Sequence, residues 1–415
     1  MAESQERRGR KSVTRVVITG RGAVSGFGVG LKGLLAGVYG DQSAVHVLSD
    51  PILGAKPYGI GAEATTFDPL SVMPAHEARH QDRFILLALA AAREALAESG
   101  LVGQQLVEWG VFAGTAVGGI TTLVNDAIAF SQGKRMSPFL LPKFIPNMAA
   151  TTLAMELGAR GMNLTFVTAC AASSNAIGEA FRAIRDGTVE AAVAIGTESL
   201  FVGPLMDSLA SARALSTRHS DPGTASRPFS LGRDGMVMGE GAGALVLETH
   251  DHALARGATP LAEVLGYGAG SDAYHPTAPR PDGQGAYEVM AAALRDAKMD
   301  QKDISYVKAH GTSTPAGDQA EAKAIRRLFG AATPPVGSLK GALGHLLGAS
   351  GAVEAVVCVE ALLRQVIPPS VNLIEQDPAI DLPIVRVPTP IRIRAIMANA
   401  FGFGGQNAAV VLGAI

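Results

Sequence analysis

Cys170 is the residue whose position best suits chemistry, because it lies in a run of small residues between an expected strand and an expected helix. The apolar, partly β-branched segment 164–167 predicts a buried strand. Apolar residues at helical spacing continue from Ile177 to Ile184, and Gly187 is placed to end that helix. A thiol on such a turn lies at the positive end of the helix dipole, which stabilises a nucleophilic thiolate. The alternative is that Cys170 fills core space as a small apolar residue.

Two of the nine histidines, His310 and His345, lie in glycine-rich loops that follow expected strands. The turn that carries His345 also carries Lys340. Imidazoles in such places can move protons or donate hydrogen bonds to a group held at the strand ends. His76 and His80 are four residues apart, but no cysteine or carboxylate set completes a site around them, so we expect no metal.

Glycine-rich motifs point to a covering loop and not to a dinucleotide site. Gly28, Gly30 and Gly33 satisfy a GxGxxG pattern, but they do not join a strand to a helix and no acidic residue follows at the required distance. The segment 399–407, "NAFGFGGQN", interleaves two phenylalanines with three glycines. It predicts a flexible loop that covers a pocket with backbone N–H groups pointing inward, although a plain hairpin turn is the alternative.

Composition excludes several classes of protein. The net charge of −2 over 415 residues gives no reason to expect nucleic-acid or membrane binding. The longest apolar run, 84–92, is too short for a membrane span, and residues 1–12 lack the apolar centre of a secretory signal, so we expect a disordered N-terminal extension there. The second cysteine, Cys358, falls in an expected apolar helix over 352–363. Two cysteines far apart form no disulfide framework, which favours a cytoplasmic location.

The chain repeats its own pattern of strands and glycine-rich loops, which indicates an α/β fold with two similar halves. Four features recur in the same order: 16–25 with 262–272, 109–119 with 305–318, 163–187 with 334–363, and 241–248 with 405–415. The predicted halves are residues 13–255 and 256–415. Reactive groups of doubled α/β folds gather where strand ends of both halves face each other, so the loops of Cys170, His310 and His345 should share one pocket.

Six motifs in this order resemble the β-ketoacyl-ACP synthases (ketosynthases), and most closely their type II elongating class. They are "TACAASSNAIG", "RALSTR", "SRPFSLGRDGMVMGEGAGALVLE", "AHGTSTPAGDQAEAKAI", "KGALGHLLGASGAVEA" and "NAFGFGGQN". The resemblance extends over about residues 13 to 413. It implies the thiolase fold, a five-layer αβαβα arrangement of two pseudo-symmetric halves. It also implies a dimer, which would explain the 47% hydrophobic composition.

The resemblance implies a role for each catalytic residue. Cys170 corresponds to the nucleophile that accepts an acyl chain from acyl carrier protein, and His310 and His345 correspond to the two catalytic histidines. Phe403 corresponds to a gating residue whose N–H completes an oxyanion hole with the N–H of Cys170. The supporting polar residues of the site would be Lys340 and Glu321.

Further residues are expected to contact the substrate or the carrier. Val117 falls where the family lines its acyl pocket. Phe401, Thr312 and Thr314 lie in the loops expected at that pocket and are interpreted as substrate-binding residues. Carrier proteins are acidic, so basic side chains should receive them. The expected docking residues are Lys134, Arg135, Arg213 and Arg79.

The implied reaction is decarboxylative Claisen condensation of the Cys-bound acyl chain with malonyl-ACP, with two neutral imidazoles donating to the transient enolate. It needs no metal or redox cofactor, and the 4′-phosphopantetheine arm belongs to the carrier. Gly341, Gln406 and Met236 depart from residues common in the family, so a specialised polyketide pathway is as good an interpretation as fatty-acid synthesis. The partner is then a second copy or a related chain-length-factor subunit.

Other functions remain as alternatives. A non-catalytic chain-length-determining partner subunit would share the fold, but the intact Cys170 and both histidines argue against it. Thiolases use a second cysteine near the C-terminus, where this chain has Asn399, Ala400 and Phe401.

Overall fold

An eleven-stranded sheet forms the centre of the protein, whose computed structural model describes residues 14–415. The predicted N-terminal extension, 1–12, lies outside the described residues. The strand order is β12-β11-β15-β16-β10-β1-β9-β7-β5-β6, with β2 (Gly28–Val29) paired to β1. The first-half strands are β1 (Val16–Ser25), β5 (Gly110–Gly114), β6 (Asn163–Phe166), β7 (Ala191–Glu198) and β9 (Gly241–Thr249). The second-half strands are β10 (Ala262–Ser271), β11 (Tyr306–Lys308), β12 (Val336–Gly337), β15 (Ala395–Phe401) and β16 (Gln406–Gly413).

The two halves have the same strand topology, which confirms the predicted doubling. In the first half β6, β5 and β7 are parallel and β9 and β1 continue antiparallel. In the second half β12, β11 and β15 are parallel and β16 and β10 continue antiparallel. Antiparallel pairing of β1 with β10 joins the halves. The predicted boundary at residue 255 coincides with the end of α10 (His250–Ala255).

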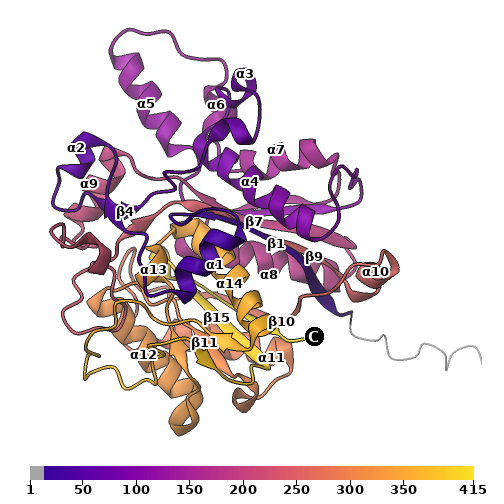
Figure 1. Ribbon diagram of the computed structural model, residues 1–415, viewed down its shortest axis with the longest axis vertical. Coiled ribbons are helices and arrows are strands. Elements are labelled where there is room, and N and C mark those ends of the chain that lie inside the picture. Colours follow the sequence, from indigo (N-terminus) through magenta and orange to yellow (C-terminus); the bar gives the residue numbers. More distant parts are fainter. Residues whose placement is uncertain (1–13) are drawn as a thin grey trace, which may run out of the picture.

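Helices cover both outer faces of the sheet and also fill the space between its halves, as a five-layer αβαβα fold requires (Figure 1). On the first half, α4 (Arg83–Glu98) and α7 (Met148–Leu157) form the outer layer. On the second half, α11 (Gln284–Ala297) packs on the strands and α12 (Pro315–Phe329) packs against α11. The central layer is α8 (Ala172–Arg185) and α14 (Ser350–Arg364).

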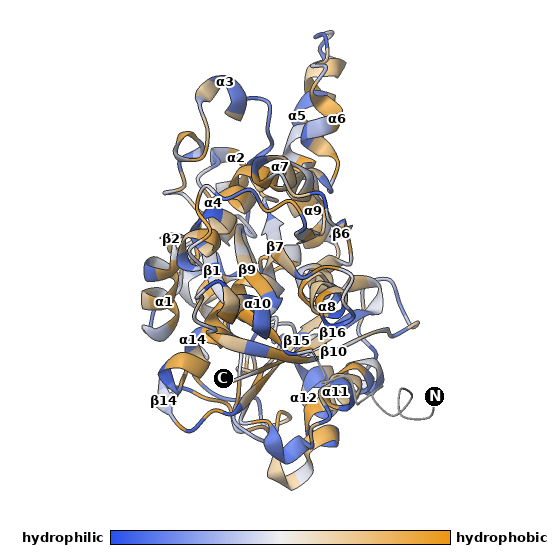
Figure 2. Cartoon of the chain, turned by 90° about the vertical axis from the view of Figure 1, so that its right-hand side faces the viewer, coloured by the Kyte–Doolittle hydropathy of each residue, from blue (hydrophilic) through white to orange (hydrophobic). Residues whose placement is uncertain are grey.

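The central helix α14 is buried on every side because strands and helices of both halves surround it, whereas α8 has a partly exposed face that includes Glu179, Arg182 and Arg185. All residues of α14 from Ser350 to Leu362 are buried, including the predicted core residue Cys358. In Figure 2, α14 and β9 carry hydrophobic colours while α3 (Ala75–Ala78), an exposed short helix, is hydrophilic. At Gly351 the two helices approach so closely that a Cβ atom would lie 2.3 Å from the Ser174 hydroxyl oxygen.

Alternating residues of β7 show how one strand serves two cores. Ala192 and Ala194 face the central helices, whereas Val193 and Ile195 face the outer layer around α4. Because both faces are covered, the strand has no polar side and reads as a continuous apolar run. Burial of each Val or Ile side chain contributes about 1.5–3 kcal/mol.

The remaining elements lie around this body. The short strands are β3 (His46–Val47), β4 (Ile60–Ala62), β8 (Met238–Gly239), β13 (Val366–Ile367) and β14 (Thr389–Pro390). The remaining helices are α1 (Leu31–Tyr39), α2 (Pro51–Gly54), α5 (Ile120–Ser131), α6 (Leu140–Phe144), α9 (Gly203–Ser211) and α13 (Lys340–Leu343). Both views show α5 and α6 standing out from the rest of the fold (Figures 1 and 2). Within residues 14–415, no helix combines the length and apolarity needed to cross a bilayer.

One prediction about the strands is wrong. The segment 164–167 was expected to be a buried strand, but β6 is the last strand of the sheet, and Leu164 and Val167 are 40% and 53% exposed. The apolar run was interpreted correctly as a strand, but apolarity alone does not distinguish a covered strand from an edge whose side chains lie on the molecular surface.

Candidate functional site

Cys170 lies in a single 3-10 turn, Ala169–Ala171, between β6 and α8, as the sequence predicts. Ala169 adopts a φ of 49°, which a residue with a Cβ rarely does. Such a conformation persists only where surrounding contacts hold it, and it is common at functional sites. The turn presents the thiol inward, where Cys170 is 4% exposed.

Two histidines from the second half lie beside this sulfur. His345, on the turn after α13, places Nε2 at 3.0 Å from Cys170 Sγ. His310 follows β11, and its ring centre is 5.2 Å from that of His345. The ring nitrogens and the sulfur that face one another all lie within 4.8 Å. The structure therefore brings together the three residues that the sequence singled out, from both halves of the fold.

The tautomer of His345 follows from its neighbours. The backbone N–H of Leu347 donates to Nδ1 at 3.3 Å, so Nδ1 carries a lone pair and Nε2 carries the proton. Ser350 Oγ lies 3.0 Å from the same Nδ1. His345 thus directs an N–H donor at the sulfur. Cys170, His310 and His345 are the only group of three metal-ligating side chains in the part of the chain that the structure describes. A protonated Nε2 has no lone pair for a metal.

Burial sets the charge of the imidazoles. The pKa of His310 and that of His345 lie well below the usual value, first because burial disfavours the charged ring and second because Lys340 is nearby. Both rings are therefore neutral at physiological pH. Nδ1 of His310 has no hydrogen-bond partner among the described residues. Two neutral N–H donors facing one pocket suit stabilisation of an anion that forms during a reaction.

The expected stabilised thiolate is wrong for the state described. Burial raises the pKa of Cys170 to about 11, even though Lys340 and the backbone N–H groups of Phe403 and Cys170 itself all lower it. Burial disfavours the charged thiolate more strongly than Lys340 and the two backbone N–H groups favour it. The free thiol is therefore protonated at neutral pH. The N–H groups of Phe403 and Cys170 are placed to stabilise negative charge that forms during a reaction.

We expect alkylation of Cys170 by iodoacetamide to accelerate about tenfold per pH unit from neutral pH upward. The rise should continue toward a midpoint of about 11, since the thiolate is the reactive species and its pKa is raised. Rates followed by intact mass in a Cys358→Ala background, which removes the second of two thiols, would measure this. Lys340→Met should slow the reaction at each pH, and a plateau already reached near neutral pH would contradict the prediction.

Lys340 is positioned by a fully buried ionic network. Its Nζ donates to the carbonyl of His310 at 2.7 Å and to Glu354 at 2.6 Å. The other oxygen of Glu354 accepts from Lys308, whose Nζ also donates to the carbonyl of Asn399 at 2.7 Å. One carboxylate therefore serves two ammonium groups, and the surplus positive charge favours negative charge at the sulfur.

Glu321 holds the loop of His310 and does not touch the sulfur. Its two carboxylate oxygens accept the backbone N–H groups of His310 at 2.8 Å and Gly311 at 2.7 Å. Asn399 Nδ2 donates to it at 3.3 Å. Burial raises the pKa of this carboxyl. The residue fixes the direction in which the His310 ring enters the pocket.

The segment 399–407 is a hairpin that lies over the cysteine turn, and the predicted flexibility of this loop stays a prediction. It joins β15 to β16, and Gly404 and Gly405 have φ of 76° and 70°, which permits the tight turn. The hairpin lies against the cysteine turn, since a Cβ on Gly402 would stand 3.0 Å from the Cys170 nitrogen. The N–H of Phe403 faces the sulfur together with that of Cys170. Asp272 ties the hairpin to the next loop through Asn407 at 2.7 Å.

An open pocket leads to the sulfur. Of the predicted residues, Cys170, His310, His345, Glu321, Phe401, Phe403, Thr312, Thr314 and Arg213 line it. The hydroxyl oxygens of Thr312 and Thr314 are 3.0 Å apart. Val117 does not line this pocket but packs with Cys170, Leu200 and Met206 in an apolar cluster behind the sulfur.

The other predicted docking residues lie outside the pocket. Lys134 and Arg135 are exposed in the loop between α5 and α6, and Arg79 is exposed after α3. Arg213 is exposed at the mouth of the pocket, where Arg280, which the sequence did not single out, also lies.

Sequence reasoning missed several buried carboxylates, of which Glu354 and Glu198 support segments of the site. Glu354 pairs both lysines, and its signal was a charged residue inside an otherwise apolar helix. Glu198 ends the apolar strand β7 and accepts the N–H groups of Ala116 at 2.7 Å and Gly348 at 2.9 Å. It thereby connects the segment of Val117 to the turn that follows His345. Burial raises the pKa of Glu198 to about 7.

Comparison with known proteins shows similarity to β-ketoacyl synthases over nearly the whole chain. Residues 13–253 match the family model "Beta-ketoacyl synthase, N-terminal domain", and residues 261–374 match "Beta-ketoacyl synthase, C-terminal domain". The chain is 42% identical to "3-oxoacyl-[acyl-carrier-protein] synthase 2" of Synechocystis over 404 residues, which cover 95% of this chain and 96% of that protein.

Solved structures agree. A β-ketoacyl synthase from Burkholderia phymatum superposes with a TM-score of 0.89 at 34% identity, over 97% of this chain and all of that one. A type II polyketide ketosynthase, solved in complex with its acyl carrier protein and bound to the hexaketide, superposes with a TM-score of 0.86 at 27% identity, again over 97% and 100% of the two chains.

Proposed function

The chain belongs to the β-ketoacyl-ACP synthase family, and on that premise we propose that Cys170 carries the growing acyl chain while His310 and His345 stabilise the enolate. The enzyme is an elongating ketosynthase, an acyltransferase that forms a carbon–carbon bond. The observation that supports these residue roles most strongly is a sulfur that faces two neutral imidazoles, one with Nε2 at 3.0 Å.

In the first half-reaction, the sulfur of Cys170 attacks the carbonyl of an acyl thioester on the carrier. A new carbon–sulfur bond forms, the bond to the carrier sulfur breaks, and the cysteine proton ends on the departing carrier thiol. The N–H groups of Cys170 and Phe403 are placed to receive the oxyanion. One thioester replaces another, so the step is close to balanced in free energy.

In the second half-reaction, a malonyl thioester binds and loses its carboxylate as CO₂ or, with water, bicarbonate. The bond electrons move onto the thioester as an enolate, whose oxygen accepts N–H groups from His310 and His345. The enolate carbon then attacks the acyl-cysteine carbonyl and expels the sulfur, which takes up one proton. The products are the 3-oxoacyl carrier and free Cys170. Lys340 and Glu321 hold His310 in place.

This chemistry proceeds by proton movement and anion stabilisation alone, so we propose that it requires no metal or redox cofactor. The 4′-phosphopantetheine arm comes with acyl carrier protein, the partner that elongating ketosynthases use. We propose that the arm enters past Thr312 and Thr314, with Phe401 and Phe403 at the inner end and Val117 at the acyl chain. Arg213 at the mouth, with Lys134, Arg135 and Arg79 farther out, would receive the acidic carrier.

We also infer that the protein works as a dimer through the edge of β6. This strand pairs with β5 alone among the described strands, and Leu164 and Val167 beside it are exposed. Further apolar side chains are exposed on α7, α5 and α6 and in the loop before α6; they are Met155, Ile128, Phe130, Leu141 and Phe139. An open edge flanked by apolar surface is the usual site of subunit pairing. The partner is a second copy or a chain-length-factor-like subunit.

The pathway is one of chain elongation on a carrier. The name of the Synechocystis relative favours fatty-acid synthesis, whereas Met236 in the pocket and the similarity to a polyketide ketosynthase favour a specialised product. We propose a cytoplasmic location, in accord with two free cysteines. The alternative function, a non-catalytic chain-length partner, has less support because Cys170 and both histidines are in place.

Incubation with acyl-loaded carrier tests the function and its docking surface together. Intact mass should show one acyl group on the wild type and none on Cys170→Ala. Lys134→Glu combined with Arg135→Glu should raise the KM for the carrier substrate about tenfold at low salt and less at high salt, because exposed charges are screened. Native mass of the same samples would report the partner.

An acyl-pantetheine substrate without the protein part is the control, since its KM should not change in the double reversal variant. No adduct on the wild type would contradict the proposed function. An adduct with an unchanged carrier KM at low salt would contradict only the docking surface.

A further inference from the structure

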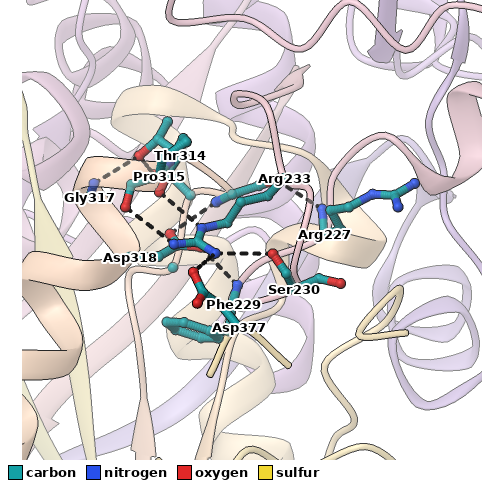
Figure 3. Close-up of polar contacts among 12 residues, drawn as sticks. Arg227, Phe229, Ser230, Arg233, Thr314, Pro315, Gly317, Asp318 and Asp377 are labelled. Carbon is teal, nitrogen blue, oxygen red and sulfur yellow. Dashed lines mark hydrogen bonds and ion pairs between the residues drawn. The ribbon is translucent and has the colours of Figure 1, made fainter. Parts of the chain in front are cut away.

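A buried arginine that the mechanism does not use connects three segments next to the pocket (Figure 3). Arg233 is 6% exposed, and its guanidinium donates to the carbonyls of Ser230 at 3.0 Å, Pro315 at 3.2 Å and Thr314 at 3.4 Å. It also pairs with Asp377 at 2.7 Å and Asp318 at 3.2 Å. A planar fork that satisfies five groups at once is a geometry that arginine alone provides.

Two residues in strained conformations are held by this group. Phe229 and Ser313 have φ of 64° and 68°, in the left-handed region that side chains with a Cβ disfavour. The carboxylate of Asp318 accepts the N–H of Phe229 at 2.8 Å and that of Ser313 at 3.1 Å. Arg233 compensates the charge of this carboxylate, whose burial raises its pKa to about 7. The backbone around Ser313 is thus fixed by Asp318 and Arg233 together.

Ser313 lies between the two threonines that line the pocket. Its strained φ sets the turn from Thr312 to Thr314, and Arg233 holds the carbonyls of Thr314 and Pro315 from behind. The Thr314 hydroxyl accepts the N–H of Gly317 at 3.2 Å, so its proton is free to point to Thr312 or into the pocket. Arg233 itself does not line the pocket.

We infer that Arg233 is a positioning residue for the substrate arm, because it fixes the 312–315 backbone so that both threonine hydroxyls face the entering pantetheine. The inference rests on the proposed function, in which the arm passes this loop. Arg233 lies behind the 312–315 loop and contacts none of Cys170, His310 and His345. Its loss should therefore weaken binding of the arm and leave the chemical steps intact.

The test measures acylation of Cys170 by acyl-pantetheine, which carries the arm without the carrier surface. Arg233→Lys keeps the charge but cannot reach all five partners, and it should raise KM roughly tenfold with kcat within about twofold. Asp377→Asn loosens the guanidinium without leaving an unpaired charge in the core, and it should raise KM about twofold to threefold. It also serves as the readout if the lysine variant does not fold.

Arg326→Lys is the matched control, since Arg326 also donates to a backbone carbonyl and pairs with an aspartate but lies away from the pocket. A double-mutant cycle gives the readout that a purely structural role would not move. In a Thr312→Val and Thr314→Val background, Arg233→Lys should no longer raise KM, because the hydroxyls through which it acts are gone.

The outcomes separate the two levels of the argument. An unchanged KM in Arg233→Lys, a fall in kcat as large as the rise in KM, or the same rise in the threonine-free background would each overturn the inference. Failure of the wild type to form an acyl adduct on Cys170 would instead contradict the proposed function itself.

Discussion

Cys170→Ala is expected to lower condensation at least about 10³-fold while malonyl-ACP is still decarboxylated. In the proposed mechanism the sulfur holds the acyl chain, whereas the enolate is stabilised by the N–H groups of His310 and His345, which the substitution does not touch. Release of CO₂ from labelled malonyl-ACP, measured beside formation of the 3-oxoacyl product, would separate the two steps.

The two histidine variants are the matched contrast. His345→Ala leaves the thiol in place but removes one enolate donor, so decarboxylation should fall about 100-fold or more. His310→Ala should do the same. If Cys170→Ala lost decarboxylation with its thermal unfolding unchanged, the separation of roles between the sulfur and the imidazoles would be wrong.

The largest effect on stability is expected from Glu354→Gln. Glu354 is the shared partner of Lys308 and Lys340, and all three side chains are buried. Loss of its charge leaves two ammonium groups without a counter-ion, which costs about 3–5 kcal/mol of unfolding free energy. Turnover should fall as well, because Lys340 supports the loop of His310 through its carbonyl. Chemical denaturation at neutral pH would measure the loss.

The pH dependence provides a second check on this variant. Burial lowers the pKa of Lys340 in the folded state, so the folded protein releases that proton before the unfolded chain does. Between these two pKa values the unfolded state binds more protons, and stability therefore rises with pH.

Glu360→Gln is the control variant. Glu360 lies in the same helix but pairs with Arg21 and Arg364 near the surface, so its loss should lower the unfolding free energy less. Equal losses of unfolding free energy in Glu354→Gln and Glu360→Gln would contradict this prediction.

Local sequence signals predicted the fold because the two halves repeat the same order of strands and glycine-rich turns. β1 spans Val16–Ser25 and β10 begins at Ala262, as the patterns indicated. The exposure of β6 was not predictable from apolarity, since an apolar edge strand has the same composition as a buried one.

The sequence predicted that Cys170, His310 and His345 lie together, as they do, but it did not predict the electrostatics around them. Small residues around Cys170 and the loops of His310 and His345 are local features, and the strand topology brings them together. Burial of the thiol depends on segments more than 200 residues apart, so its raised pKa could not be read from the turn alone. The contacts of Arg233 with Pro315 and Asp377 likewise join residues that are 82 and 144 positions apart in the sequence.

The contact at Gly351 has a consequence for how this enzyme tolerates change. Cys170 lies in the 3-10 turn directly before α8, and His345 lies shortly before α14, so the separation of sulfur and imidazole depends on the spacing between those helices. A methyl group added at Gly351 would push against Ser174 and part the helices. Substitutions in the buried interface between α8 and α14 should therefore lower turnover, even where the substituted residue does not contact substrate.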